Sequence, residues 1–140
     1  MRHLNPFITT VSERYRVARE QVEEEYREEI EREIRSYLKQ FEFHLLHRFG
    51  EVRLTTSTKG RVAAYAYSWQ NRICINPVLF LENREDFLDQ TIPHEVAHIV
   101  ADKYYKKDCA HGNHWKLMMA KIGKPADRCH QYDTSKSKMK

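Results

Sequence analysis

The sequence predicts one α+β domain, in which a long N-terminal helix precedes a small sheet and further helices. The chain has 140 residues, the usual size of one domain, and 41% of them are hydrophobic. Residues 7–49 contain neither glycine nor proline, and their apolar side chains recur every three or four positions. Residues 52–76 instead contain short runs rich in β-branched and aromatic residues. Helical and strand-rich segments separated in this way predict the α+β class.

The first predicted element is one amphipathic helix, or two helices in series, over residues 11–45. Thr10 and Glu13 fit a capping box at its start, and Gly50 is predicted to end it. Glu and Arg crowd residues 20–42 at spacings that allow i,i+4 pairs, which indicates a charged outer face.

Three strands are predicted next, at residues 52–58, 62–68 and 72–76, in an antiparallel or mixed sheet. A hairpin turn is expected at residues 59–61, which contain Gly60, between the first two strands. Three aromatic side chains share one face of the second strand, namely Tyr65, Tyr67 and Trp69. We expect them in the sheet core, with a substrate wall or a base-stacking platform as the alternative.

Two helices are predicted after the sheet. The first begins at Asn83, a residue suited to the N-cap, and continues to about Tyr105 with a break at Pro93. The second covers residues 113–122, with Trp115 on its apolar face, where we expect core packing. We divide the domain into an N-terminal helical segment (1–50), a core (51–133) and a disordered basic tail (134–140).

Composition restricts the setting of the protein. No apolar run approaches the roughly 18 residues that span a bilayer, and the N-terminus leads into charged sequence, so we expect a cytoplasmic protein without membrane contact. Three cysteines without a CxxC pair are typical of reduced thiols and exclude a four-cysteine zinc site within the chain. The net charge of +4 is concentrated at the end, because residues 103–140 contain 10 Lys and Arg against 3 Asp.

The segment PHEVAH, residues 93–98, contains the strongest chemical signal. On a helix, His94 and His98 lie one turn apart on the same face, where both imidazoles can bind one metal ion. Glu95 projects about 100° around the helix, as a general base beside the metal rather than as a ligand. Neutral imidazoles with one open position are typical of catalytic zinc, so Zn²⁺ is the predicted cofactor.

A catalytic zinc of this type needs a third protein ligand. Glu95 is the last glutamate of the chain, and the position six residues after His98 is Tyr104, so neither a later Glu nor the metzincin spacing supplies it. The remaining candidates are His111, His114, Asp108, Cys109 and the 127–133 group. Chain reach favours His111, because six residues beyond a helix end at Tyr105 can return to the metal. Gly112 is expected to give backbone freedom there.

Four segments together resemble the SprT-like family of zinc metalloproteases. They are INPVLFLEN (75–83), PHEVAHIV (93–100), HGNHWKLMM (111–119) and CHQYD (129–133). The resemblance covers residues 52–133 and implies a zincin-like fold in which a short sheet packs beside the active-site helix. It places the family's three zinc ligands on His94, His98 and His111, and its catalytic glutamate on Glu95.

The resemblance also implies a zinc-dependent endopeptidase that acts on DNA-associated or DNA-crosslinked proteins, with single-stranded or damaged DNA as a partner. We expect the protein to lack the second zinc-binding segment that is typical of the family. The alternative is a non-catalytic zinc-containing module associated with DNA or transcription.

Further candidates carry less weight. His130 and Tyr132 follow the last helix and are candidates for contact with the substrate or the oxyanion. Seven basic residues are candidates for nucleic-acid contact: Lys103, Lys106, Lys107, Lys116, Lys121, Lys124 and Arg128.

Overall fold

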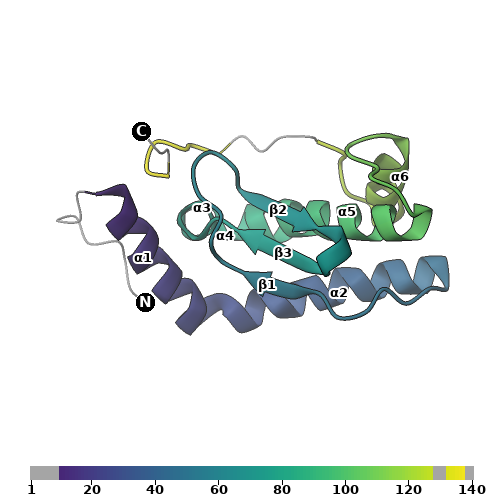
Figure 1. Ribbon diagram of the computed structural model, residues 1–140, viewed down its shortest axis with the longest axis horizontal. Helices are drawn as coiled ribbons and strands as arrows, with labels where there is room; N and C mark the ends of the chain where they lie inside the picture. Colours follow the sequence, from purple (N-terminus) through teal and green to yellow (C-terminus); the bar gives the residue numbers. More distant parts are fainter. Residues whose placement is uncertain (1–9, 128–131, 138–140) are drawn as a thin grey trace.

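The computed structural model describes residues 10–127 and 132–137, and its helices cover one face of a three-stranded sheet (Figure 1). The helices that pack on this face are α2 (Arg27–Leu45) and α5 (Ile92–Tyr105). Between them and the sheet lies a core that includes Phe41 of α2, Ile73 of the sheet and Val96 of α5, all without exposed surface. This arrangement is the predicted α+β architecture.

The N-terminal helix is two helices in series, joined by one turn of π-helix. Helix α1 (Val11–Gln21) begins at Thr10, whose hydroxyl accepts a hydrogen bond from the Glu13 backbone N–H at 3.2 Å, and residues 22–26 form the π-helical turn before α2. The predicted start is therefore confirmed.

The predicted end of this helix at Gly50 is wrong. Helix α2 ends at Leu45, and Leu46 takes the left-handed conformation with φ 51°. The physical reason lies downstream: Phe49 is 2% exposed, and its N–H donates to the Glu42 carboxylate at 2.9 Å. To bury Phe49 the chain has to turn before it, so Gly50 follows in a loop.

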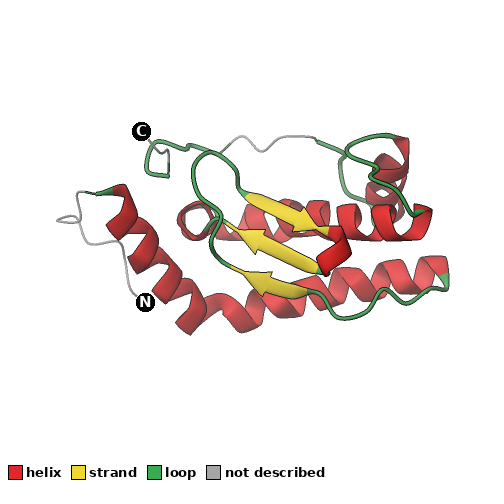
Figure 2. Cartoon of the chain, viewed as in Figure 1, coloured by secondary structure: helices red, strands yellow, loops and turns green. Residues whose placement is uncertain are grey.

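The sheet is mixed, as one of the two predicted alternatives proposed (Figure 2). Its strands are β1 (Arg53–Thr55), β2 (Ala64–Tyr67) and β3 (Arg72–Ile75), in the order β1–β3–β2. Strand β3 is central, and its last three residues are buried; it runs parallel to β1 and antiparallel to β2.

The expected hairpin at residues 59–61 is wrong, because β1 and β2 do not pair. The hairpin instead joins β2 to β3, through a 3-10 turn at Ser68–Gln70 and a left-handed Asn71. The buried Asn76 side chain donates to the carbonyl oxygens of Gly60 and Val62, each at 3.1 Å. These bonds hold the segment before β2 as a loop that carries the chain past β3.

The helices after the sheet differ from the prediction at their start. Helix α3 (Pro77–Glu82) was not predicted; its N-cap is Asn76, whose side-chain oxygen accepts from the N–H groups of Val78 and Leu79. Asn83 separates α3 from the short α4 (Arg84–Asp86) and makes no side-chain cap hydrogen bond.

The predicted break near Pro93 is a turn of π-helix at residues 87–91, after which α5 begins. Pro93 lies in the first turn of α5, where a missing N–H costs nothing. Helix α6 (Asn113–Lys121) matches its prediction to within a residue.

The C-terminal segment returns to the N-terminal helix. Residues 134–137 belong to the tail predicted to be disordered, yet they form a turn, and the Tyr15 hydroxyl donates to the Ser137 carbonyl at 2.8 Å. Residues 138–140 lie outside the described part of the chain. Within residues 10–127 and 132–137, no helix combines the length and apolar character needed to cross a bilayer.

Candidate metal centre

Three histidine side chains converge beside β2. His94 and His98 project from successive turns of α5, and His111 reaches them from the loop between α5 and α6. Their Nε2 atoms lie 3.0 Å (His94 to His111), 3.1 Å (His98 to His111) and 3.2 Å (His94 to His98) apart. Among the described residues, these three form the one cluster of His, Cys, Asp and Glu able to hold a metal ion.

The chemistry of the three rings fits a metal ion. Burial, with the neighbouring histidines, lowers the pKa of His94 to about 4 and that of His98 to about 3. These rings are therefore neutral near pH 7, and a neutral imidazole presents a lone pair to a metal.

The other candidates for the third ligand do not join the cluster. The His114 ring stacks on Tyr105, with ring centroids 3.7 Å apart. The Asp108 carboxylate accepts a hydrogen bond from the Ala110 N–H at 3.0 Å, and the Cys109 thiol faces the Lys107 carbonyl at 3.6 Å. Of the 127–133 group, residues 128–131 lie outside the described part of the chain.

Glu95 stands next to the cluster. Its carboxylate oxygen lies 3.7 Å from Nε2 of His94, and the residue is 7% exposed. Burial raises the pKa of Glu95 to about 8. A carboxylate with a pKa near neutrality, within reach of the cluster, is suited to proton transfer.

Trp115 forms the floor under the three rings. It is fully buried, as the prediction of core packing requires, and its ring centroid lies 4.7 Å from those of His94 and His111 and 5.4 Å from that of His98. Its indole N–H donates to the His94 carbonyl at 3.2 Å. Trp115 therefore fixes α6 against the face of α5 that carries the histidines.

The loop that carries His111 is shaped differently from the expectation. Gly112 has an ordinary φ of −75°, so its backbone freedom is not used. A Cβ at this position would instead lie 3.1 Å from the Cys109 carbonyl oxygen. Glycine is needed here for close backbone approach, while Lys106 and Ala110 take the left-handed conformations.

An open pocket of about 690 Å³ lies over the histidines and Glu95. Strand β2 forms its wall, and Tyr65 and Trp69 are 56% and 67% exposed along it. Their expected place in the sheet core is therefore wrong. Strand β2 is an edge strand with the helices packed on its other face, and the small Ala64 and Ala66 take the inward positions. Alanines alternating with tyrosines were the signal that could have indicated this.

Of the two candidates after the last helix, Tyr132 lies within the described residues and His130 does not. Tyr132 stacks on Phe87, and its hydroxyl shares a 2.8 Å hydrogen bond with Thr91, a residue of the pocket lining. Burial raises the pKa of Tyr132 above its usual value. His130 and Arg128 lie outside the described residues.

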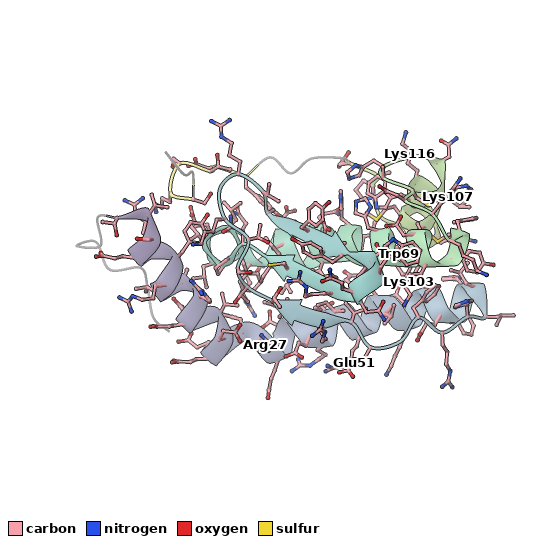
Figure 3. The ribbon with its side chains drawn as sticks, in the orientation of Figure 1. Arg27, Glu51, Trp69, Lys103, Lys107 and Lys116 are labelled. Atoms are coloured by element: carbon pink, nitrogen blue, oxygen red, sulfur yellow. The ribbon has the colours of Figure 1, made fainter. Side chains whose placement is uncertain are left out.

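The basic candidates fall into two groups. Lys103 donates to the Phe49 carbonyl and to the Asn71 side chain, both at 2.6 Å, and Lys124 pairs with Asp89. The Lys103 ammonium group thus joins two loops of the fold, and Lys124 forms a surface ion pair. Four are exposed. Lys106, Lys107 and Lys116 lie near the junction of α5 and α6, where Figure 3 labels the last two, and Lys121 lies at the C-terminal end of α6.

Comparison with known proteins adds an independent observation. The model of the SprT-like family matches residues 20–135. Protein SprT of Klebsiella pneumoniae (strain 342) is 36% identical over 103 residues, which are 73% of this chain and 62% of that protein. Protein SprT of Yersinia pseudotuberculosis serotype IB (strain PB1/+) is 34% identical over 108 residues, 76% of this chain and 64% of that protein.

Protein SprT of Escherichia coli O1:K1 / APEC is 37% identical over 103 residues, again 73% of this chain and 62% of the relative. The chain thus spans somewhat less than two thirds of the length of these curated relatives. No solved structure matches the chain significantly.

Proposed function

Because the chain belongs to the SprT-like family, we propose that it is a zinc-dependent endopeptidase with a zincin-type fold. One observation carries the proposal: three converging histidines and a buried glutamate line an open pocket. A purely structural metal site needs neither a proton acceptor beside it nor access from outside. This site has a proton acceptor, Glu95, and it opens into the pocket.

His94, His98 and His111 would hold the zinc ion, which would leave one coordination position for water or substrate. When bound, zinc polarises a carbonyl oxygen and makes water more acidic. Glu95 accepts the proton of the attacking water and returns it to the nitrogen of the leaving amine. Trp115 keeps the histidine rings in place from below.

The wall of the pocket fits a polypeptide substrate. Tyr65 and Trp69 expose apolar rings beside the cluster, and Val62 is 49% exposed in the same lining. Exposed apolar groups at a concave site are suited to the side chains of an extended chain. We propose that these residues contact the substrate on the side of β2.

The proposal extends to the substrate class. We propose DNA-associated or DNA-crosslinked proteins, with single-stranded or damaged DNA as partner. The family resemblance supports this, and so do the three exposed lysines near the α5–α6 junction and Lys121 at the end of α6. Tyr132 remains a candidate for substrate contact through Thr91, at the edge of the pocket.

The test combines metal analysis with proteolysis. The zinc-loaded protein is incubated alone, with single-stranded DNA and with a DNA-binding protein, and the fragments are identified by mass spectrometry. Glu95→Gln keeps the shape of the site and removes the proton acceptor, so we expect full zinc content and a loss of cleavage of at least about 100-fold. Equal cleavage by the wild-type protein and by Glu95→Gln would contradict the mechanism. A zinc-loaded wild-type protein that cuts nothing would favour the non-catalytic module.

A further inference from the structure

Asp102 is a buried carboxylate that faces the pocket one turn beyond His98, and it is not a member of the histidine cluster. It is 8% exposed, and its two oxygens bind two different segments. Oδ1 accepts the N–H of Cys109 at 2.7 Å, and Oδ2 accepts the hydroxyl of Ser68 at 2.6 Å. Both hydrogen bonds are buried and charge-assisted, the kind that holds its geometry most firmly.

The first segment carries the third histidine. Cys109 lies two residues before His111, in a loop whose backbone is held in left-handed conformations at Lys106 (φ 57°) and Ala110 (φ 46°). Residues other than glycine populate this region sparsely, so the loop does not hold this shape by its own preference. The Asp102 carboxylate supplies an anchor between these two positions.

The second segment carries the pocket wall. Ser68 is 6% exposed and begins the 3-10 turn that presents Trp69 beside the pocket. The same carboxylate therefore contacts the turn with Trp69 and the loop with His111. Its own helix carries His94 and His98.

We infer that Asp102 is a positioning residue that holds the third histidine and the aromatic wall in register with the two histidines of α5. The inference rests on the proposed metal site. We call the two hydrogen bonds of Asp102 its Cys109 arm and its Ser68 arm, and they have different consequences. The Cys109 arm sets how well His111 is placed to bind the metal, and the Ser68 arm sets where Trp69 contacts the substrate.

Zinc affinity, measured by competition with a chromophoric chelator, tests the first arm. Asp102→Ala removes the anchor, and we expect zinc affinity to fall about 10- to 100-fold, as it does when the partners of metal ligands are lost. Asp102→Asn keeps an oxygen for the Cys109 N–H and an amide that donates to Ser68, so affinity stays within about threefold of wild type. Asp89→Asn, which breaks a surface ion pair, serves as the control and leaves affinity unchanged.

Ser68→Ala separates the two arms. It removes the hydroxyl that donates to Asp102 at 2.6 Å and lies 3.5 Å from the His98 carbonyl, and it leaves the Cys109 contact in place. Zinc affinity should therefore stay within about twofold, while KM for a peptide substrate rises. Hydrogen exchange of the Cys109 amide gives a readout that needs neither metal nor proteolysis. The exchange accelerates in Asp102→Ala and stays slow in Ser68→Ala, even if the protein proves to cut no peptide.

Two results would overturn the inference. One is an Asp102→Ala protein with wild-type zinc affinity and a protected Cys109 amide. The other is an Asp102→Asn protein as impaired as Asp102→Ala, because the loss would then follow the charge and not the anchor. If Asp102→Ala does not fold, zinc affinity and amide exchange in Asp102→Asn and Ser68→Ala decide the question.

Discussion

The fold and the proposed chemistry favour opposite charge states of Glu95. Its burial disfavours the ionised form, which raises its pKa from 4.5 to about 8 in the absence of a cation. A metal ion beside it would favour the ionised form that accepts protons. The residue therefore costs stability in the metal-free protein at high pH, and the binding of a cation offsets that cost.

This cost predicts a pH-dependent effect of Glu95→Gln on the metal-free protein. The folded pKa lies above the unfolded one, so the contribution of Glu95 to stability is complete below pH 4.5 and is lost as pH rises through 8. At pH 9 the free energy of unfolding of the variant should exceed that of wild type by about 2–4 kcal/mol, and near pH 5 this gain should fall below about 1 kcal/mol. Thermal unfolding after chelator treatment measures both values. A gain of equal size at both pH values would show that the charge is not its cause.

The identity of the third ligand gives a second prediction at this scale. His111→Ala removes one of three converging rings, so zinc affinity should fall by more than about 100-fold and activity should be lost. His114→Ala removes a ring that stacks on Tyr105 and should keep zinc and most activity. Bound zinc is measured after dialysis against a mild chelator. If His111→Ala retained zinc and His114→Ala lost it, the third ligand would be His114 and not His111.

At the scale of elements, sequence pattern predicted the helices better than the connections. The periodicity of apolar residues in α2, α5 and α6 is a local property of the sequence, so it predicts these helices directly. The pairing of β3 with both neighbours, and the left-handed Leu46 and Asn71, depend on contacts distant in sequence. The same holds for the histidines: their convergence could be anticipated from the motif and chain reach, whereas the two contacts of Asp102 could not.

The edge position of β2 leads to a prediction about Trp69. This ring is 67% exposed in the pocket lining, so Trp69→Ala should leave folding and zinc content unchanged. If the wall contacts substrate, KM for a peptide with bulky apolar residues should rise about 5- to 10-fold, equivalent to roughly 1 kcal/mol of lost contact. Phe43→Ala removes a ring of α2 that is 79% exposed and absent from the pocket lining, and it should leave KM unchanged. Equal effects of both variants would argue against a specific wall.

At the scale of the whole molecule, charge is divided between the two sides of the fold. The helical segment from Glu20 to Glu42 is acidic with interleaved arginines, such as Arg27 between Glu23 and Glu31. The junction of α5 and α6 instead exposes three lysines, and Lys121 follows at the end of α6. A polyanion would be attracted to this junction and repelled by the acidic helices, which would orient it toward the side of the molecule that carries His111.

This asymmetry predicts how DNA binding should depend on salt. Binding of single-stranded DNA should weaken linearly in log K against log salt, and each lysine that neutralises a phosphate should add about 0.7 to the slope. Replacing Lys107 and Lys116 by Ala should therefore reduce the slope by up to about 1.4, whereas Lys39→Ala, on α2, should not change it. Lys103→Ala should mainly lower the free energy of unfolding and have a smaller effect on DNA affinity, because the Lys103 ammonium group bonds Phe49 and Asn71. A slope unaffected by Lys107 and Lys116, or no binding at low salt, would remove DNA as a partner and leave the metal site as proposed.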